Sequence, residues 1–235
     1  MRRRSILLPI LASLPVLVAL LWLGTWQVHR LHWKTAMLAR IAAAEAGPAV
    51  PLAGNPAPYA KVVATGRLDY GREALLGVEV RGTTLGGHLL TPLLRPDAPP
   101  VLVDRGWVPL ERTHGIDRPA GEVAITGYVR QADTRDWNSP KDDTAGRRFY
   151  VFDPAAIGAA LDLPRPAPFG LVALAPADAP PGALPAAARS LPRPDNPHLG
   201  YAITWYGLAA ALVGVLTAFL IRGSGPPPKP EDPAA

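Results

Sequence analysis

The side chains best suited to acid–base or metal chemistry in this 235-residue chain are its five histidines, and they are widely dispersed. His29 and His32 are three positions apart, and the others are His88, His114 and His198. No carboxylate near His29 and His32 completes a metal-binding spacing, and the HExxH, GxSxG and Walker-loop motifs are absent. We interpret His88, in a strand-like run, and His114, in a predicted turn, as surface or core histidines.

Other catalytic residue types are equally unpromising. The chain has no cysteine, which excludes disulfides and thiolate chemistry. Ser139 and Ser190 are the only serines between residues 35 and 195, so a serine nucleophile is not expected. We therefore expect no catalytic residues and no enzymatic activity.

Two groups of charged residues in this middle part have structural interpretations. Asp136, Asp142 and Asp143 lie in DWNSPKDD, a pattern typical of a solvated turn. Asp104 and Arg105 lie inside an apolar strand-like run, where charges are costly unless they are paired. Pairing within the fold is the expected role of Asp104 and Arg105.

The elements that would position any functional side chain begin with two apolar runs. Residues 5–28 and 196–221 carry no formal charge, and each is longer than the roughly 20 apolar residues that span a bilayer. The first run exceeds the usual apolar core of a cleaved signal peptide, and no A-x-A site follows it. A transit peptide is also disfavoured, because only Met1 to Arg4 precede the run. Both runs are predicted to be transmembrane helices.

The formal charge of +5 comes from the N-terminal part of the chain. Residues 1–34 contain five basic and no acidic side chains, whereas residues 35–195 contain 17 of each sign. A neutral body argues against nucleic acid as a partner. Lys and Arg residues flank the outer ends and the loop ends of the two apolar runs in equal numbers, so they do not by themselves set the orientation in the membrane. Long loops, however, translocate largely regardless of charge. We therefore predict cytoplasmic termini and an extracytoplasmic loop.

The loop itself is predicted to be β-rich. Residues 61–68 and 121–130 alternate between apolar and polar positions, as half-buried antiparallel strands do. Five further strand candidates are residues 73–80, 87–94, 101–109, 147–153 and 169–175. Residues 153–163 are predicted to be a helix, with Asp153 as N-cap and Pro154 at its first position. A small antiparallel barrel or sandwich with one or two helices fits this pattern.

The predicted fold class is thus membrane α+β, with two transmembrane helices flanking a β-rich extracytoplasmic domain. The predicted segments are a basic cytoplasmic N-terminus (1–4), a transmembrane helix (5–28), a helical extension (29–46), the β-rich domain (47–195), a second transmembrane helix (196–221) and a disordered cytoplasmic tail (222–235).

Aromatic and histidine side chains gather near the loop-side ends of both predicted transmembrane helices. At 100° per residue, one group falls within about 60° on the first helix and another within about 60° on the second. They are Trp22, Trp26, His29 and Trp33 on the first, and His198, Tyr201 and Trp205 on the second. Two interpretations remain open. One is an aromatic belt at the membrane surface. The other is a shallow cleft for a flat, apolar, metal-bearing ligand such as haem, whose iron commonly takes a histidine ligand.

Small residues repeat at four-residue steps along the second helix, at Ala210, Gly214 and Ala218. Such a face suits close helix packing in membranes. This face is therefore a candidate surface for close helix packing.

Six motifs in order resemble those of the Surfeit-locus family of cytochrome c oxidase assembly factors. The terminal motifs are LGTWQVHRLHWK (23–34) and NPHLGYAITWYGLAAA (196–211); between them lie GGHLLTP (86–92), VLVDRGWVP (101–109), GEVAITGYVR (121–130) and RRFYVFDPAAI (147–157). Phe149 stands where the family often has Trp, and Asp104 where it often has Asn; neither affects the helix motifs. The resemblance covers nearly the whole chain except its tail.

This resemblance implies a multi-pass protein of the bacterial inner membrane that supports maturation of haem–copper oxidase. It implies transient binding of haem a and delivery to oxidase subunit I, with haem a synthase and membrane lipid as further contacts. The family histidine linked to haem maps onto His198, the expected iron ligand. Trp205, Tyr201, Trp26 and His29 are the other expected haem-binding residues, His29 from the residue pattern alone. The alternatives are a scaffold for an oxidase assembly intermediate and, least favoured, an enzyme acting on haem or lipid.

Overall fold

The computed structural model describes residues 2–111 and 115–223, so His114 and the tail beyond Gly223 lie outside the described residues. The chain divides into two compact units. One comprises Met1–Ala39 with Pro194–Ala235, and the other comprises Arg40–Arg193.

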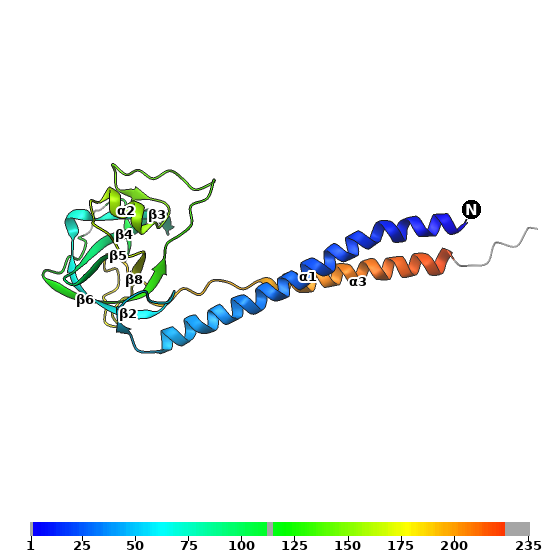
Figure 1. Cartoon of the computed structure of the whole chain (residues 1–235), viewed down its shortest axis with the longest axis horizontal. Coiled ribbons are helices and arrows are strands. Elements are labelled where there is room, and N and C mark those ends of the chain that lie inside the picture. The colour runs from blue at the N-terminus through cyan, green and yellow to red at the C-terminus, as the bar shows by residue number, and fades with distance from the viewer. Residues whose placement is uncertain (1, 112–114, 224–235) are drawn as a thin grey trace, which may run out of the picture. The chain divides into compact units, whose positions relative to one another are not determined.

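The first unit is built from two long helices, α1 (Arg2–Ala46) and α3 (His198–Gly223) (Figure 1). Both are long and apolar enough to cross a membrane, over Pro9–Ala46 and His198–Arg222. Helix α1 continues without a break through the predicted span and its predicted extension, and its last residues, from Arg40, belong to the second unit. These helices give the chain the character of a membrane-anchored protein.

The second unit is a small β-barrel. Its five strands lie in the order β2, β6, β8, β5 and β4, and pairing of β2 with β4 closes the ring. All neighbours are antiparallel except β5 and β8. The strand bounds are β2 (Lys61–Leu68), β4 (Thr84–Arg95), β5 (Ala98–Pro109), β6 (Glu122–Gln131) and β8 (Phe169–Ala173). Of the two predicted architectures, the structure therefore has the barrel.

Smaller elements extend the barrel. Strand β3 (Ala74–Arg81) forms a hairpin with β4, while β1 (Val50–Pro51) and β7 (Arg148–Phe149) each add a two-residue parallel edge. A 3₁₀ turn, η1 (Tyr70–Arg72), joins β2 to β3. Helix α2 (Pro154–Ala160) begins where Asp153 accepts hydrogen bonds from the backbone of Ala155 and Ala156, which confirms the predicted cap.

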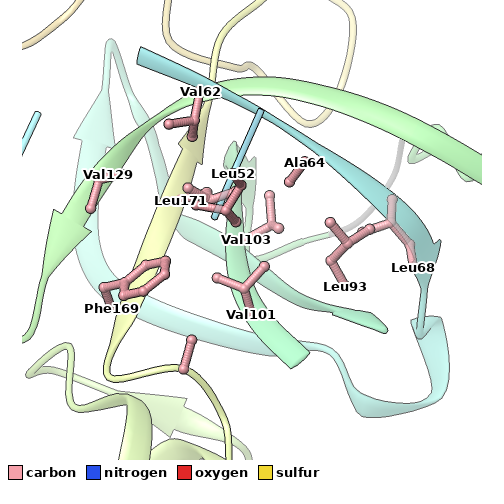
Figure 2. Packing of buried hydrophobic residues seen from close by; sticks show 11 residues of the cluster. Leu52, Val62, Ala64, Leu68, Leu93, Val101, Val103, Val129, Phe169 and Leu171 are labelled. Carbon is pink, nitrogen blue, oxygen red and sulfur yellow. The ribbon is translucent and has the colours of Figure 1, made fainter. Parts of the chain in front are cut away.

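Two apolar clusters lie on opposite sides of the strands. Figure 2 shows the cluster between the strands of the barrel, where the alternating residues of β2 all point inward. Its buried members are Leu52, Val62, Ala64, Leu68, Leu93, Val101, Val103, Val129, Ala167, Phe169 and Leu171. The second cluster packs α2 against β3, β4 and β5 and consists of Ala74, Leu76, Leu90, Leu102, Phe149, Phe152, Ile157, Leu161 and Leu163. Strand β5 is buried on both faces from Val101 to Pro109, which agrees with its apolar sequence on either side of Asp104 and Arg105.

The predicted strands are present, with one marked difference. The candidate at 147–153 contains only the two-residue β7, because Tyr150 and Val151 leave the sheet and Phe152 packs into the α2 cluster. The proline-rich stretch after β8 stays largely irregular. It is held to β5 by reciprocal backbone hydrogen bonds between Trp107 and Ala186, with N–O distances of 3.1 and 2.8 Å.

Candidate functional site

The central polar contact of the helical unit joins His198 to Gln27. His198 is the first residue of α3, and its Nδ1 lies 2.7 Å from Oε1 of Gln27 on α1. Gln27 is only 8% exposed, whereas His198 is half-buried. Because a carbonyl oxygen can only accept, Nδ1 is the donor, and in the neutral ring Nε2 is then the nitrogen with the lone pair. A histidine whose other ring nitrogen donates to a carbonyl is oriented as metal-binding histidines are.

Further contacts hold α1 and α3 together around this pair. The Tyr206 ring lies against the backbone at Gly24, where an added Cβ would stand 2.9 Å from Cε1 of the ring. The Tyr206 hydroxyl is also 3.0 Å from Oγ1 of Thr25. Two residues before the start of α3, Nδ2 of Asn196 donates to Oγ1 of Thr35 at 3.2 Å. These contacts fix where His198 stands relative to α1.

The other predicted haem-binding residues are less closely associated. Trp26, His29 and Tyr201 are exposed, and Trp205 is half-buried. Within residues 2–111 and 115–223, no hydrogen bond or ion pair links any of the four to His198. The structure thus brings His198 to Gln27, and leaves an exposed aromatic surface on each helix.

The small-residue face of α3 does not pack against α1. Ala210, Gly214 and Ala218 are exposed, and a Cβ added at Gly214 would meet nothing within 4 Å. The residues of α3 that are buried are Ala202 and Ala209. The polar and ring contacts made by His198 and Tyr206 set the rotation of the helix, and they turn the small-residue face outward.

Gln27 is the residue of this pair that chemical reasoning from the sequence did not single out. It lies in the LGTWQVHRLHWK motif, but an amide has no strong chemistry of its own. Its importance comes from a partner 171 positions away. The family motif that contains it was the only signal in the sequence.

The donor set suits a haem better than a bare metal ion. Within the described ranges, no group of three or more His, Cys, Asp or Glu side chains is placed to hold a metal. A haem iron is already held by its macrocycle and needs only one or two axial ligands from protein. His198, whose Nδ1 is held by Gln27, could supply one such ligand through Nε2.

In the barrel unit, His88 bridges two carboxylates. Its Nδ1 lies 2.9 Å from Asp104 Oδ2, and its Nε2 lies 3.0 Å from Glu79 Oε2. The hydrogen bond to Asp104 is the main cause that raises the pKa of His88, and burial opposes it. The hydrogen bond from Arg81 is the main cause that lowers the pKa of Glu79. His88 is therefore a paired cation within the fold, which agrees with the structural role predicted for it.

Arg105 is buried in a second charged cluster. Its guanidinium lies 3.5 Å from Glu73, donates to the backbone oxygen of Asp117 and covers the Tyr70 ring at 5.3 Å. Arg118 also binds Glu73, at 2.5 Å. Burial lowers the pKa of Arg105, and burial also raises that of Tyr70. The predicted pairing of Asp104 and Arg105 is thus confirmed, with a different partner for each.

The barrel unit also carries a large open cleft of about 1340 Å³. It lies between the barrel wall and the proline-rich stretch, with Leu68, Trp107, Ile125, Leu174, Leu184 and Leu191 among its apolar lining residues. Charged side chains of both signs stand around it, including Lys61, Glu111 and Arg189. The described residues that line it include the hydroxyls of Thr84 and Ser190 but no histidine, so no Ser–His pair faces this cleft.

Comparison with known proteins identifies the family of this chain. The model of the SURF1 family matches residues 14–210, which include the first helix motif, the whole barrel and the second helix motif up to its last residue but one. The chain belongs to the SURF1 family.

Relatives of this SURF1-family chain span animals, a choanoflagellate and yeast. Surfeit locus protein 1 of Xenopus tropicalis is 29% identical over 219 residues, which cover 83% of this chain and 70% of the relative. The SURF1-like protein of Monosiga brevicollis is 29% identical, with 93% and 92% covered. The Cytochrome oxidase assembly protein SHY1 of Saccharomyces cerevisiae is 32% identical over 117 residues, or 46% of this chain and 30% of the relative. The resemblance inferred from the motifs is confirmed at the level of the family.

Proposed function

We propose that this chain is a membrane-anchored assembly factor for haem–copper cytochrome c oxidase, which binds haem a transiently and aids its insertion into subunit I. Membership of the SURF1 family and the name of the yeast relative support the assembly role. The hydrogen bond between His198 and Gln27 supports the haem role. No catalytic residue is assigned.

In this proposal His198 supplies an axial ligand through Nε2, and haem supplies the redox-active iron that the oxidase needs. Gln27 holds the Nδ1 proton and thereby the ring orientation. Trp26, Tyr201 and Trp205 offer aromatic surface for the macrocycle, and the exposed His29 is the weakest member of the set. Binding through one ligand on a half-buried surface suits a protein that must also release its cargo.

We place the protein in the bacterial inner membrane, with both termini in the cytoplasm and the barrel in the periplasm. The two apolar helices support membrane anchoring, and the weak influence of charge in long loops favours export of the barrel. Subunit I is the proposed recipient, with haem a synthase and membrane lipid as further contacts.

The test is the optical spectrum of the full-length protein purified from cells that make haem a. We expect an a-type haem spectrum that His198→Ala loses. His32→Ala is the matched control, because His32 is an exposed histidine on α1 that lies outside the proposed haem-binding set, and this variant should keep the haem. Equal haem content in the wild type and His198→Ala would refute haem binding through His198.

The second candidate is a scaffold that stabilises an oxidase assembly intermediate without holding haem. The large cleft and the mixed charges around it favour this candidate, since they suit a protein partner. Wild-type protein that carries oxidase subunits but no haem would support the scaffold and exclude the haem role.

A further inference from the structure

The most exposed large apolar side chain of the barrel unit is Trp137. It is 96% exposed, whereas the next such residue in this unit, Val80, is 62% exposed. Trp137 lies in the loop between β6 and β7, which stands clear of the barrel in green in Figure 1. Single exposed apolar residues are common, but a whole indole ring in water is a large unburied surface.

Hydrogen bonds around Trp137 order the tip of this loop. Oδ1 of Asp136 accepts from the backbone N of Asn138 and from the Ser139 hydroxyl, both at 3.0 Å. The backbone N of Asp136 in turn donates to Oγ of Ser139 at 2.9 Å. The tip is therefore a closed polar turn that presents the indole outward.

The base of the loop is tied to the barrel unit as well. Arg135 pairs with Asp142 and donates to the backbone oxygen of Pro140 at 2.9 Å. Asp142 also accepts from the backbone N of Tyr150 at 2.8 Å. Asp143 exchanges backbone hydrogen bonds of 2.9 and 2.8 Å with Arg148 of β7. None of these contacts uses the Trp137 side chain, so the loop's order does not depend on it.

We propose that Trp137 is a docking anchor for a protein partner with an apolar pocket and basic groups around its edge. Tryptophan is among the residues most enriched in interface hot spots, and few rotatable bonds limit the entropy that it loses on burial. A loop that is already ordered reduces the cost further. Since the chain is proposed to assist oxidase assembly, the partner is an oxidase subunit, and this inference rests on that function.

The charges of the loop favour protein over membrane as the partner. Tryptophan also inserts at membrane surfaces, but anionic membrane surfaces attract basic segments. Residues 135–143 contain three carboxylates, Asp136, Asp142 and Asp143, against the two cations Arg135 and Lys141. A partner with basic groups around its pocket complements this net negative charge.

Photo-crosslinking in the native membrane tests the surface directly. Trp137 is replaced by benzoylphenylalanine in the full-length protein, and the adducts formed on irradiation are identified by mass spectrometry. The same replacement at Val80, on the exposed part of β3, is the matched control. We expect an oxidase-subunit adduct at position 137 that is at least tenfold more abundant than at position 80. An adduct with lipid alone would overturn the proposal in favour of the membrane, and the absence of any adduct would also overturn it.

Co-purification separates this inference from the proposed function. Trp137→Ala should weaken retention of the oxidase subunit about thirtyfold, the effect of losing a strong hot-spot residue. Val80→Ala should leave retention unchanged, and both variants should unfold at the wild-type temperature. If Trp137→Ala retains the subunit as the wild type does, the docking proposal fails and the assembly function stands. If the wild type retains no oxidase subunit, both fail.

Discussion

His198 at the start of α3 and Gln27 on α1 form a hydrogen bond of 2.7 Å across 171 positions of sequence. The glutamine is buried and contributes its carbonyl oxygen, so Nδ1 is the donor and the neutral imidazole is held in one tautomer. This pairing makes His198 different from the exposed His29, for which residues 2–111 and 115–223 supply no hydrogen-bond partner. The first prediction follows from that difference.

Gln27→Leu should lower haem occupancy of the purified protein about 10- to 100-fold, the usual effect of losing the residue that orients a metal-binding histidine. The leucine keeps the side-chain bulk but removes the acceptor for Nδ1. The measurement is the ratio of haem absorbance to protein. Gln27→Glu, which retains an accepting oxygen, is the matched variant and should retain more haem than Gln27→Leu. Equal occupancy in the wild type and Gln27→Leu would show that the hydrogen bond does not orient a ligand.

Gly106 should be intolerant of any side chain. Its φ of 120° is a conformation that L-residues rarely adopt, and an added Cβ would overlap the backbone oxygen of Ala186. Gly106→Ala would therefore combine backbone strain with displacement of the stretch that pairs with Trp107. We expect a loss of about 2–5 kcal/mol, which corresponds to a fall of order 10 °C in the midpoint of barrel unfolding.

Circular dichroism of the β signal during heating measures this midpoint. Gly115→Ala is the control, because an added Cβ there meets nothing within 4 Å. A midpoint for Gly106→Ala that matches that of Gly115→Ala would mean that the proline-rich stretch contributes little to the stability of the barrel.

Much of this barrel can be predicted from the local sequence, because strand alternation and helix capping each depend on residues only a few positions apart. The alternation along β2 and the Asp153 cap of α2 are examples, and the structure confirms both. The side of α3 that contacts α1 could not be predicted in this way. Repeated small residues indicate that a close approach is possible on the face of Ala210, but the actual rotation depends on contacts with residues more than 150 positions earlier. For the same reason the orienting role of Gln27 was not visible from its residue type.

The pair of carboxylates around His88 should make barrel stability depend on pH. The folded-state pKa of His88 is raised above its unfolded value of about 6.5. The stabilisation that protonated His88 gives to the folded barrel is therefore complete below pH 6.5, and it is lost as the pH rises through the folded-state pKa. The pKa of Glu79 is lowered in the folded state. The stabilisation from ionised Glu79 is therefore present above its unfolded pKa, and it is lost as the pH falls through the folded-state pKa.

Thermal unfolding across pH 4 to 9 should show this dependence. The difference in midpoint between the wild type and His88→Asn should be largest in weakly acidic solution and should shrink on the alkaline side. His32→Asn, which changes an exposed histidine of α1, controls for the general effect of removing an imidazole. A difference between the wild type and His88→Asn that stays constant with pH would contradict the assignment of His88 as a paired cation.

The predicted orientation can be measured because the chain contains no cysteine, so each introduced thiol is the only one. Ala145, an exposed residue in the loop that carries Trp137, should lie in the periplasm, and Ala234 in the cytoplasm. In cells with a permeable outer membrane, an impermeant maleimide should label Ala145→Cys, but should label Ala234→Cys only after the inner membrane is broken. Labelling in the reverse pattern would put the barrel in the cytoplasm. An oxidase partner of Trp137 would then have to be reached from that side, so this measurement also determines which surfaces of the oxidase are available to the loop.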